Sequence, residues 1–273
     1  MLPATLSGAT RLVPILAHPV DHVRAPRTYN PAFAAAGLDW CLVPMGVHPD
    51  DLAATLAQLA RVSNLQGVNL TIPHKPHAFR ICKWLTREAA RVRMVNTMRL
   101  EPDGHWAGTN SDGAGFIGAA REHRVLDATR PVVIVGSGGA GSAIAFALAD
   151  AGVREIHVSD VHAARAEQLA QALRDTFAGI EATTRRDALP RAGLAVNATP
   201  LGLHAGDAMP FDPALLRDDA ALFDIIAARD TELMAAAHAR GLRVLGGRPM
   251  VQHQLATQIA FWRRDPIDLE PHA

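Results

Sequence analysis

Cysteine is scarce in this sequence, and no targeting segment is visible in it. The two cysteines, Cys41 and Cys82, form no C-x-x-C pair. So few thiols in a chain of 273 residues exclude a disulfide framework and indicate a reducing compartment. The first residues lack a basic stretch followed by an apolar core, so we expect no signal peptide and a cytoplasmic protein.

An excess of charge of one sign is lacking as well. Lysine plus arginine and aspartate plus glutamate number 27 each, which leaves no formal net charge. Such a chain has no long-range attraction for nucleic acid or an anionic membrane, although a local patch is not excluded. We therefore expect neither as a partner, while a homodimer is compatible with the sequence. With 49% hydrophobic residues the chain can bury a globular core, in two medium domains or one large one.

The motifs of metal and hydrolase sites are also missing. The chain has 13 histidines but no H-E-x-x-H motif and no Cys/His pairing. His18 and His22 are separated by Pro19, which argues against a helix that presents both rings, and His74 and His77 lie in a similarly irregular stretch. No G-x-S-x-G motif supports a serine hydrolase. We therefore expect no metal site.

One long uncharged run, residues 131–149, is long enough to suggest a membrane span. Its centre, however, reads GSGGAG, and glycines weaken a continuous helix. A buried strand, a tight turn and a buried helix fit the run better. We therefore interpret it as part of a globular fold.

Short apolar runs alternate with helical patterns along the whole chain. The apolar runs predict strands at 11–17, 40–47, 67–73, 131–136, 155–160, 194–200, 221–226 and 242–247, the last of these being the final strand. The helical patterns predict helices at 30–38, 50–62, 137–151, 163–177, 231–241 and 249–263. Strands that alternate with helices are typical of α/β layers, and the regular second half predicts a doubly wound parallel sheet.

The strand at 131–136 runs into a motif of the G-x-G-x-x-G type, which reads Gly136-Ser137-Gly138-Gly139-Ala140-Gly141. Its glycines allow a tight turn, close approach of the backbone to a pyrophosphate, and close packing of helix and strand. The N–H groups that open the next helix would hold the diphosphate. Because the motif follows a strand and opens a helix, it predicts a dinucleotide site. A glycine turn without a ligand is the plainer alternative.

Asp160 ends the next predicted strand, roughly 20 residues beyond the glycine motif, where a carboxylate can bind the adenosine ribose. Such a carboxylate accepts a hydrogen bond from a free 2′-hydroxyl and repels a 2′-phosphate. We therefore expect NAD to be preferred, with NADP still usable because Arg165 follows nearby. The structural alternative is that Asp160 only caps a helix.

Three polar residues outside the glycine motif are candidates for chemistry. Lys75 follows a predicted strand end, and a lysine whose pKa is lowered by partial burial can handle a hydroxyl proton. Asp112 lies in the glycine-flanked segment 108–116, and Asn96 is a polar residue within an apolar run. Taken singly, each has a plain alternative: a solvated surface lysine, a turn-forming aspartate and a buried amide with internal partners.

Together these segments resemble the shikimate dehydrogenase family along nearly the whole chain. The similar segments, in chain order, are VNLTIPHK, the VNT of 95–97, GTNSDGAGF, GSGGAG, NATPLGL and GGRPMVQHQ. Several motifs in the right order are far more specific than any one of them.

The resemblance implies that Lys75 and Asp112 are a catalytic pair that manages the hydroxyl proton of the substrate. It also implies that the substrate hydroxyls are bound by Thr71, Asn96 and Gln254. The cofactor would be contacted by Asn197 and Thr199. The family's fold returns the last helix to the N-terminal domain. This implies an N-terminal α/β substrate domain of residues 1–112 plus 248–273 and a Rossmann domain of residues 113–247.

The sequence departs from the family where the family binds the substrate carboxylate. The family's S-x-S-P segment aligns with Val23-Arg24-Ala25-Pro26, so both serines are replaced, and a family tyrosine aligns with Ala227. Arg24 would bind a carboxylate only if its side chain turned inward. We therefore expect shikimate and quinate themselves to be poor substrates, and the physiological substrate is left open.

The sequence thus predicts reversible NAD(P)-dependent alcohol–ketone interconversion on a small cyclic polyol of the shikimate or quinate type. A non-catalytic dinucleotide-binding sensor or regulator is the alternative from another class. The altered carboxylate residues favour it, whereas Lys75 and Asp112 speak against it because a sensor needs neither. Another two-domain dehydrogenase, such as one acting on folate carbon units, is a third alternative.

Overall fold

The computed structural model describes residues 6–21 and 23–272. The chain divides into two compact units, Met1–Ser111 with Leu255–Ala273, and Asp112–Gln254. The predicted division placed Asp112 with the N-terminal domain and began its returning segment at 248. In the structure Asp112 belongs to the second unit, and the chain returns to the first unit after Gln254, inside α9 (Arg248–Trp262). The assignment of substrate and cofactor to the two units stays a prediction.

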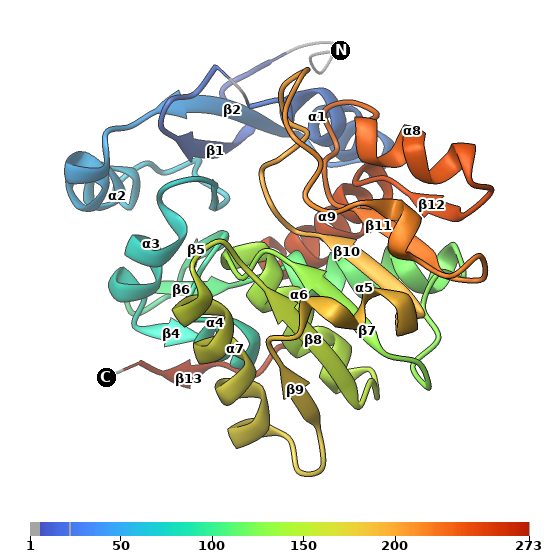
Figure 1. Ribbon diagram of the computed structural model, residues 1–273. Helices are drawn as coiled ribbons and strands as arrows, with labels where there is room; N and C mark the ends of the chain where they lie inside the picture. Colours follow the sequence, from blue (N-terminus) through green and yellow to red (C-terminus); the bar gives the residue numbers. More distant parts are fainter. Residues whose placement is uncertain (1–5, 22, 273) are drawn as a thin grey trace. The chain divides into compact units, whose positions relative to one another are not determined.

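The first unit contains a mixed seven-stranded sheet (Figure 1). In sheet order its strands are β13 (Glu270–Pro271), β4 (Trp84–Leu85), β6 (Trp106–Thr109), β5 (Thr97–Leu100), β3 (Val68–Leu70), β1 (Arg11–Ala17) and β2 (Trp40–Gly46). β1 pairs in parallel with β2 and β3, while β5 is antiparallel to both β3 and β6. The predicted strands at 11–17 and 40–47 are confirmed, and the one predicted at 67–73 is shorter, ending at Leu70. The structure adds β13 beyond the strand that was expected to be last.

The helices of the first unit bury apolar residues against this sheet. They are α1 (Pro26–Ala35), α2 (Leu52–Leu59), α3 (Lys75–Ile81), α4 (Arg87–Val92) and the second half of α9, with a 3-10 turn η1 (Pro49–Asp51) before α2. Leu52 and Leu56 of α2 are almost fully buried and share a core cluster with Leu16, Val68 and Leu70 of the strands. The core thus lies between α2 and the parallel strands β1 and β3.

The second unit is built on a sheet of parallel strands. In sheet order these are β12 (Arg243–Leu245), β11 (Ala221–Asp224), β10 (Leu194–Asn197), β7 (Val132–Val135), β8 (Glu155–Ser159) and β9 (Glu181–Thr183). Numbered within the unit, this is the order 6-5-4-1-2-3 of a Rossmann fold, whose topological switch point lies between β7 and β10. The predicted doubly wound sheet is confirmed. β9 was missed because it is short and its first residue is exposed.

Helices connect and cover these strands. They are α5 (Asp112–Glu122), α6 (Gly139–Asp150), α7 (Ala163–Thr176), α8 (Glu232–Ala239) and the first half of α9, with 3-10 turns η2 (Arg186–Arg191) and η3 (Pro213–Leu215). α6 contacts β7, α7 contacts β8 and β9, and α8 contacts β11 and β12 (Figure 1). The uncharged run at 131–149 is therefore a strand, a turn and a helix, as predicted. In the part of the chain that the structure describes, no helix is long and apolar enough to span a membrane.

Two glycines lie in the first turn of α5, which begins at Asp112. Gly113 and Gly115 would normally weaken a helix, but here each lies against another helix. A Cβ on Gly113 would come within 2.7 Å of the Ala143 carbonyl oxygen of α6, and a Cβ on Gly115 within 2.4 Å of Cγ of Gln254 on α9. The glycines therefore permit close helix packing, which offsets their low helix propensity.

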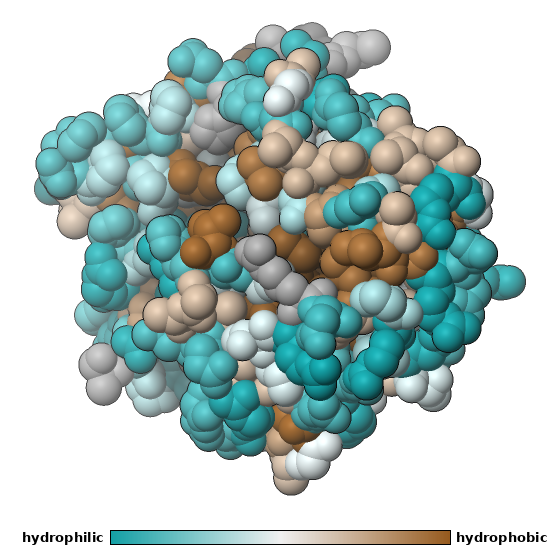
Figure 2. Space-filling model, viewed as in Figure 1, coloured by the Kyte–Doolittle hydropathy of each residue, from teal (hydrophilic) through white to brown (hydrophobic). Residues whose placement is uncertain are grey.

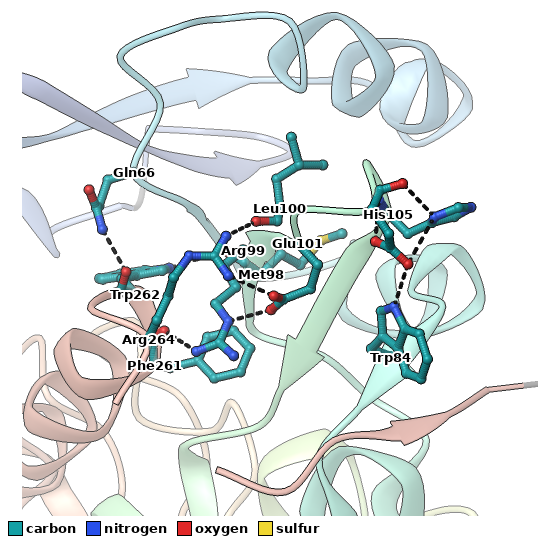
Figure 3. Close-up of polar contacts among 11 residues, drawn as sticks. Gln66, Trp84, Met98, Arg99, Leu100, Glu101, His105, Phe261, Trp262 and Arg264 are labelled. Carbon is teal, nitrogen blue, oxygen red and sulfur yellow. Dashed lines mark hydrogen bonds and ion pairs between the residues drawn. The ribbon is translucent and has the colours of Figure 1, made fainter. Parts of the chain in front are cut away.

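Charged and polar contacts attach the end of α9 to the first unit (Figure 3). Glu101 accepts hydrogen bonds from Arg99 Nε and Arg264 Nη1, both at 2.6 Å. Partial burial alone would raise the pKa of Glu101, but the two guanidinium groups outweigh it and lower that pKa. Arg99 also donates to the Phe261 carbonyl at 2.6 Å, and Trp262 Nε1 donates to the Met98 carbonyl at 3.1 Å. These bonds join α9 to β5, although the two segments lie far apart in the sequence.

Candidate active site

The glycine motif forms the loop between β7 and α6, at the carboxyl edge of the parallel sheet. Gly136 has a φ of +105°, and a Cβ there would lie 2.7 Å from the backbone of Ala198. A Cβ on Gly141 would lie 1.9 Å from the Gly136 carbonyl oxygen. A Cβ on Gly138, in contrast, would meet no described atom within 4 Å. Two glycines are thus needed for packing, while the one between them faces open space.

This loop fits a dinucleotide. Gly138 precedes the first residue of α6 and, having no side chain, leaves the N-terminus of that helix uncapped by its own side chain. The loop lies next to the switch point between β7 and β10, where dinucleotides bind in folds of this order. Gly139, Ala140 and Gly141 form the first turn of α6, so their N–H groups point toward the end of the helix that attracts anions.

Asp160 follows β8 and binds the glycine loop. Its Oδ2 accepts hydrogen bonds from the N–H and the hydroxyl of Ser137 at 2.8 and 2.9 Å, and its Oδ1 accepts from the His162 N–H at 2.8 Å. Partial burial works to raise the pKa of Asp160, but these three bonds lower it overall. Asp160 therefore carries a negative charge beside the loop and also braces it, whereas the N-cap residue of α7 is His162. The contact of Asp160 with an adenosine ribose stays a prediction. Val161 beside it is 85% exposed.

Asn197 is the last residue of β10, and its buried side chain connects neighbouring segments of the second unit. Its Nδ2 donates to Asp224 Oδ1 at 3.0 Å and to the Leu201 carbonyl at 3.1 Å, and its Oδ1 accepts from the N–H and hydroxyl of Thr199. Burial raises the pKa of Asp224, against hydrogen bonds from Thr231, Ile226 and Asn197. Asn197 thus shapes the loop that touches Gly136. Asp224, the last residue of β11, is the partner of Asn197 in this network, and the sequence analysis did not identify it.

In the first unit, Thr71, Lys75 and Asn96 gather at one edge of the sheet. Thr71 follows β3, and its carbonyl accepts from the His74 N–H at 2.8 Å. Lys75 is the first residue of α3, and its carbonyl accepts from the N–H of Val95 at 3.1 Å. Asn96 bridges two strands, because its N–H donates to Thr109 and its carbonyl accepts from Leu70. Backbone pairing thus brings together three residues that the sequence places in two separate segments.

The surface at this edge is partly apolar. Ile72, between Thr71 and Pro73, is 63% exposed. Figure 2 shows hydrophobic patches on one face of the molecule, within a surface that is otherwise mostly hydrophilic. An apolar side chain therefore lies beside polar groups that can bind hydroxyls, a combination typical of small-molecule sites.

In the second unit, Asp112 and Gln254 are direct partners. Gln254 Nε2 donates to Asp112 Oδ1 at 3.0 Å, and Asp112 is 3% exposed. Asp112 is the first residue of α5, where a carboxylate is favourably placed at the positive end of the helix dipole. Lys75 belongs to the first unit and Asp112 to the second, so their pairing stays a prediction.

The residues aligned with the carboxylate-binding serines lie just before α1. Ala25 is the N-cap residue and makes no side-chain cap hydrogen bond, and Val23 is half-buried. Arg24 is exposed, and its Nη1 donates to the Asp21 carbonyl at 2.8 Å. Its guanidinium is thus engaged locally at the surface. Ala227 is half-buried beyond β11 in the second unit.

Two pairs of histidines were considered for metal binding, His18 with His22 and His74 with His77. His22 lies outside the described residues, so the spacing of His18 and His22 has no structural counterpart here. Among residues 6–21 and 23–272, no group of three or more histidine, cysteine, aspartate or glutamate residues is arranged to hold a metal ion. His74 is completely buried, and neither of its ring nitrogens has a hydrogen-bond partner in the described structure.

Comparisons with known proteins show what the chain is similar to. The model of the shikimate dehydrogenase substrate binding domain matches residues 15–98. A shikimate dehydrogenase (NADP(+)) of Rubrobacter xylanophilus is 38% identical over 96% of this chain and 94% of that protein. The structure of shikimate 5-dehydrogenase from Thermus thermophilus, in complex with NADP(H) and shikimate, is similar with a TM-score of 0.84 and 31% identity over 95% of each chain. The ligand-free 5-ketofructose reductase of Gluconobacter sp. strain CHM43 is similar with a TM-score of 0.83 and 25% identity, again over 95% of each chain.

Proposed function

The chain belongs to the shikimate dehydrogenase family, and on that premise we propose that Lys75 and Asp112 manage the hydroxyl proton in the oxidation of a cyclic polyol. It is an NAD(P)-dependent oxidoreductase that acts on a CH–OH group. The observation that carries the proposal is the hydrogen bond from Gln254 to the buried carboxylate of Asp112. One residue of the pair that the resemblance assigns to proton transfer is thus in contact with a residue that it assigns to the substrate hydroxyls, although the two are far apart in the sequence.

The remaining roles are assigned to the glycine loop of the second unit and to the sheet edge of the first unit that carries Thr71, Lys75 and Asn96. The loop from Gly136 to Gly141 would hold the diphosphate of the cofactor, whose nicotinamide supplies hydride transfer when bound. Thr71 and Asn96 would bind hydroxyls of the substrate. Lys75, at the start of α3, would pass the proton of the reacting hydroxyl, a contribution that is typically about 10²–10⁴-fold in rate.

The preferred cofactor is the point at which the comparisons depart from the sequence. The Rubrobacter relative is named for NADP(+), and the Thermus structure holds NADP(H). The comparisons therefore favour NADP over the predicted preference for NAD. The negative charge of Asp160 beside the glycine loop still acts against a 2′-phosphate, so cofactor selectivity depends on how far this charge is offset.

A spectrophotometric screen tests the proposed function. The purified protein is assayed with shikimate, quinate and cis-cyclohexane-1,2-diol, each with NAD⁺ and NADP⁺. Turnover of at least one alcohol, lost on Lys75→Ala, is the expected result. Tight binding of a cofactor without turnover of any of the three would instead favour the dinucleotide-binding sensor.

A substrate without a carboxylate is a second candidate, and it rests on the residues before α1. Val23 and Ala25 have no side-chain hydrogen-bond donors, and Arg24 is engaged with the Asp21 carbonyl. A carboxylate that leaves water without protein donors keeps a large desolvation penalty. The similar 5-ketofructose reductase is named for a substrate without a carboxylate. This candidate predicts a higher kcat/KM for the uncharged diol than for shikimate or quinate.

A further inference from the structure

A series of buried polar side chains connects α9 to Asn96 within the first unit. Asn69 Nδ2 donates to Gln258 Oε1 at 3.0 Å, Gln258 Nε2 donates to Ser111 Oγ at 2.9 Å, and Ser111 Oγ donates to Asn96 Oδ1 at 3.3 Å. All four residues are at most 5% exposed. Gln258 lies one helical turn beyond Gln254 on α9 and contacts Asn69 and Ser111, whereas Gln254 contacts Asp112.

Each bond in this series fixes the direction of the next. The amide nitrogen of Asn69 can only donate, so it selects the carbonyl oxygen of Gln258. The amide of Gln258 must then present its nitrogen to Ser111. Because that nitrogen donates, the hydroxyl of Ser111 accepts there and directs its single proton to Asn96.

The carboxamide oxygen of Asn96 is consequently saturated. It accepts from the Ser111 N–H at 3.1 Å, from the Ser111 hydroxyl at 3.3 Å and from the Thr97 hydroxyl at 2.8 Å. A carbonyl oxygen has two lone pairs, and three donors leave it no capacity for a ligand. Any contact between Asn96 and a ligand must therefore use the amide N–H₂ group, which donates.

We infer that Gln258 is a positioning residue, which holds Asn96 through Ser111 so that its amide donates to an oxygen of the substrate. The inference rests on the proposed function for the identity of that substrate as a polyol. The amide of Asn96 would then donate to the oxygen of a hydroxyl or ketone that acts as a hydrogen-bond acceptor. It also explains why a buried glutamine, which is costly to desolvate, lies on the core side of α9.

Kinetics separate this role from a merely structural one. Gln258→Met keeps the length of the side chain and removes its hydrogen bonds with Asn69 and Ser111. Ser111→Ala removes only the hydroxyl that links Gln258 to Asn96. Gln252→Leu is the control, because Gln252 is an exposed glutamine on the same helix. Assays use shikimate and cis-cyclohexane-1,2-diol at saturating cofactor. We expect KM to rise about tenfold in the first two variants with kcat nearly unchanged, the pattern of a lost ground-state contact. A lower Tm and lower Vmax with unchanged KM would overturn the inference.

A second measurement does not depend on turnover. The side-chain ¹⁵N–¹H₂ signals of Asn96 are identified by their loss in Asn96→Asp. In Gln258→Met they should shift and broaden, and in Gln252→Leu they should remain as in the wild type. Unchanged signals in Gln258→Met overturn the inference even if the enzyme is active. A wild-type protein that turns over none of the tested alcohols contradicts the proposed function instead, and the Asn96 signals still decide whether Gln258 positions Asn96.

Discussion

Gln254 on α9 holds the carboxylate of Asp112 at the first residue of α5, with Nε2 of the glutamine 3.0 Å from Oδ1 of the aspartate. The carboxylate is buried, and an amide N–H is a donor that does not titrate. The glutamine therefore orients the carboxylate without competing for its proton. Close approach of α9 to α5 requires Gly115, where a Cβ would collide with Gln254.

The first prediction concerns Asp112 itself. Asp112→Asn should lower kcat about a hundredfold or more, because an amide cannot accept a proton, while the affinity for the cofactor stays nearly unchanged. Steady-state kinetics and fluorescence titration with NADPH measure the two effects. Asp175→Asn, at an exposed aspartate of α7, is the control. Near wild-type kcat in Asp112→Asn would remove Asp112 from the mechanism.

Lys75→Ala should lower kcat to a similar extent. Lys83 is the other lysine of the chain, and it forms an exposed ion pair with Asp103, so Lys83→Ala is a matched control that should keep full activity. Lys75→Arg should not restore activity, because a guanidinium does not release its proton near neutral pH. Equal losses in Lys75→Ala and Lys83→Ala would argue for a general charge effect and against a role for Lys75 in proton transfer.

Asp160→Asn should shift cofactor selectivity toward NADP about tenfold, measured as the ratio of the two Kd values. The variant removes a negative charge that acts against the 2′-phosphate and keeps an oxygen that can accept from Ser137. Because any loosening of the glycine loop affects both cofactors, the ratio isolates the charge. Asp187→Asn, at an exposed aspartate elsewhere in the same unit, should leave the ratio as it is. An unchanged ratio in Asp160→Asn would place the ribose away from this carboxylate.

The double variant Val23→Ser/Ala25→Ser should raise kcat/KM for shikimate. A hydrogen bond to a charged group contributes roughly 1.5–3 kcal/mol, so the gain should be at least about tenfold. The kcat/KM for cis-cyclohexane-1,2-diol, which has no carboxylate, should stay the same and is the internal control. Efficient turnover of shikimate by the unmodified protein would contradict the second candidate substrate.

His74 should make stability depend on pH. Burial lowers the pKa of His74, helped by His77 and His18, against smaller opposite effects from the backbone groups of Val47 and Ala17. These groups lie near the ring, but neither has the geometry of a hydrogen-bond partner. The unfolded chain therefore binds more protons than the folded one as the pH falls below about 6.5, and the folded state loses stability there.

His74→Phe removes this effect while keeping a ring of similar shape. A buried nitrogen without a partner costs about 1–3 kcal/mol, which for a protein of this size corresponds to a Tm shift of at least about 2–4 °C. The Tm of the variant should exceed that of the wild type at pH 5 by this margin, and the difference should narrow at pH 8. His123→Phe, at an exposed histidine, should not change the pH dependence. A parallel pH dependence in His74→Phe and the wild type would contradict the assignment.

Local patterns predicted the fold of the second unit well, for a physical reason. The apolar run of β7, the glycine loop and the start of α6 are contiguous, and the steric needs of such a turn are written in adjacent residues. The position of Asp160 beside the glycine loop could likewise be predicted from its place at the end of the next strand. The short strands β4 and β13 could not, because two-residue strands depend on their partners and show no periodicity of their own.

The sequence by itself determined the α/β class and the doubly wound parallel sheet of the second unit, and it supplied the candidate residues for the chemistry. Only the tertiary structure decided how these residues are held. It showed that Asp112 begins a helix, that Asn197 is buried against Asp224, and that Gln258 connects Asn69 to Ser111 across the sheet. Such contacts join positions far apart in the chain. Their hydrogen-bond directions depend on every neighbour at once, so no local pattern of residues can encode them.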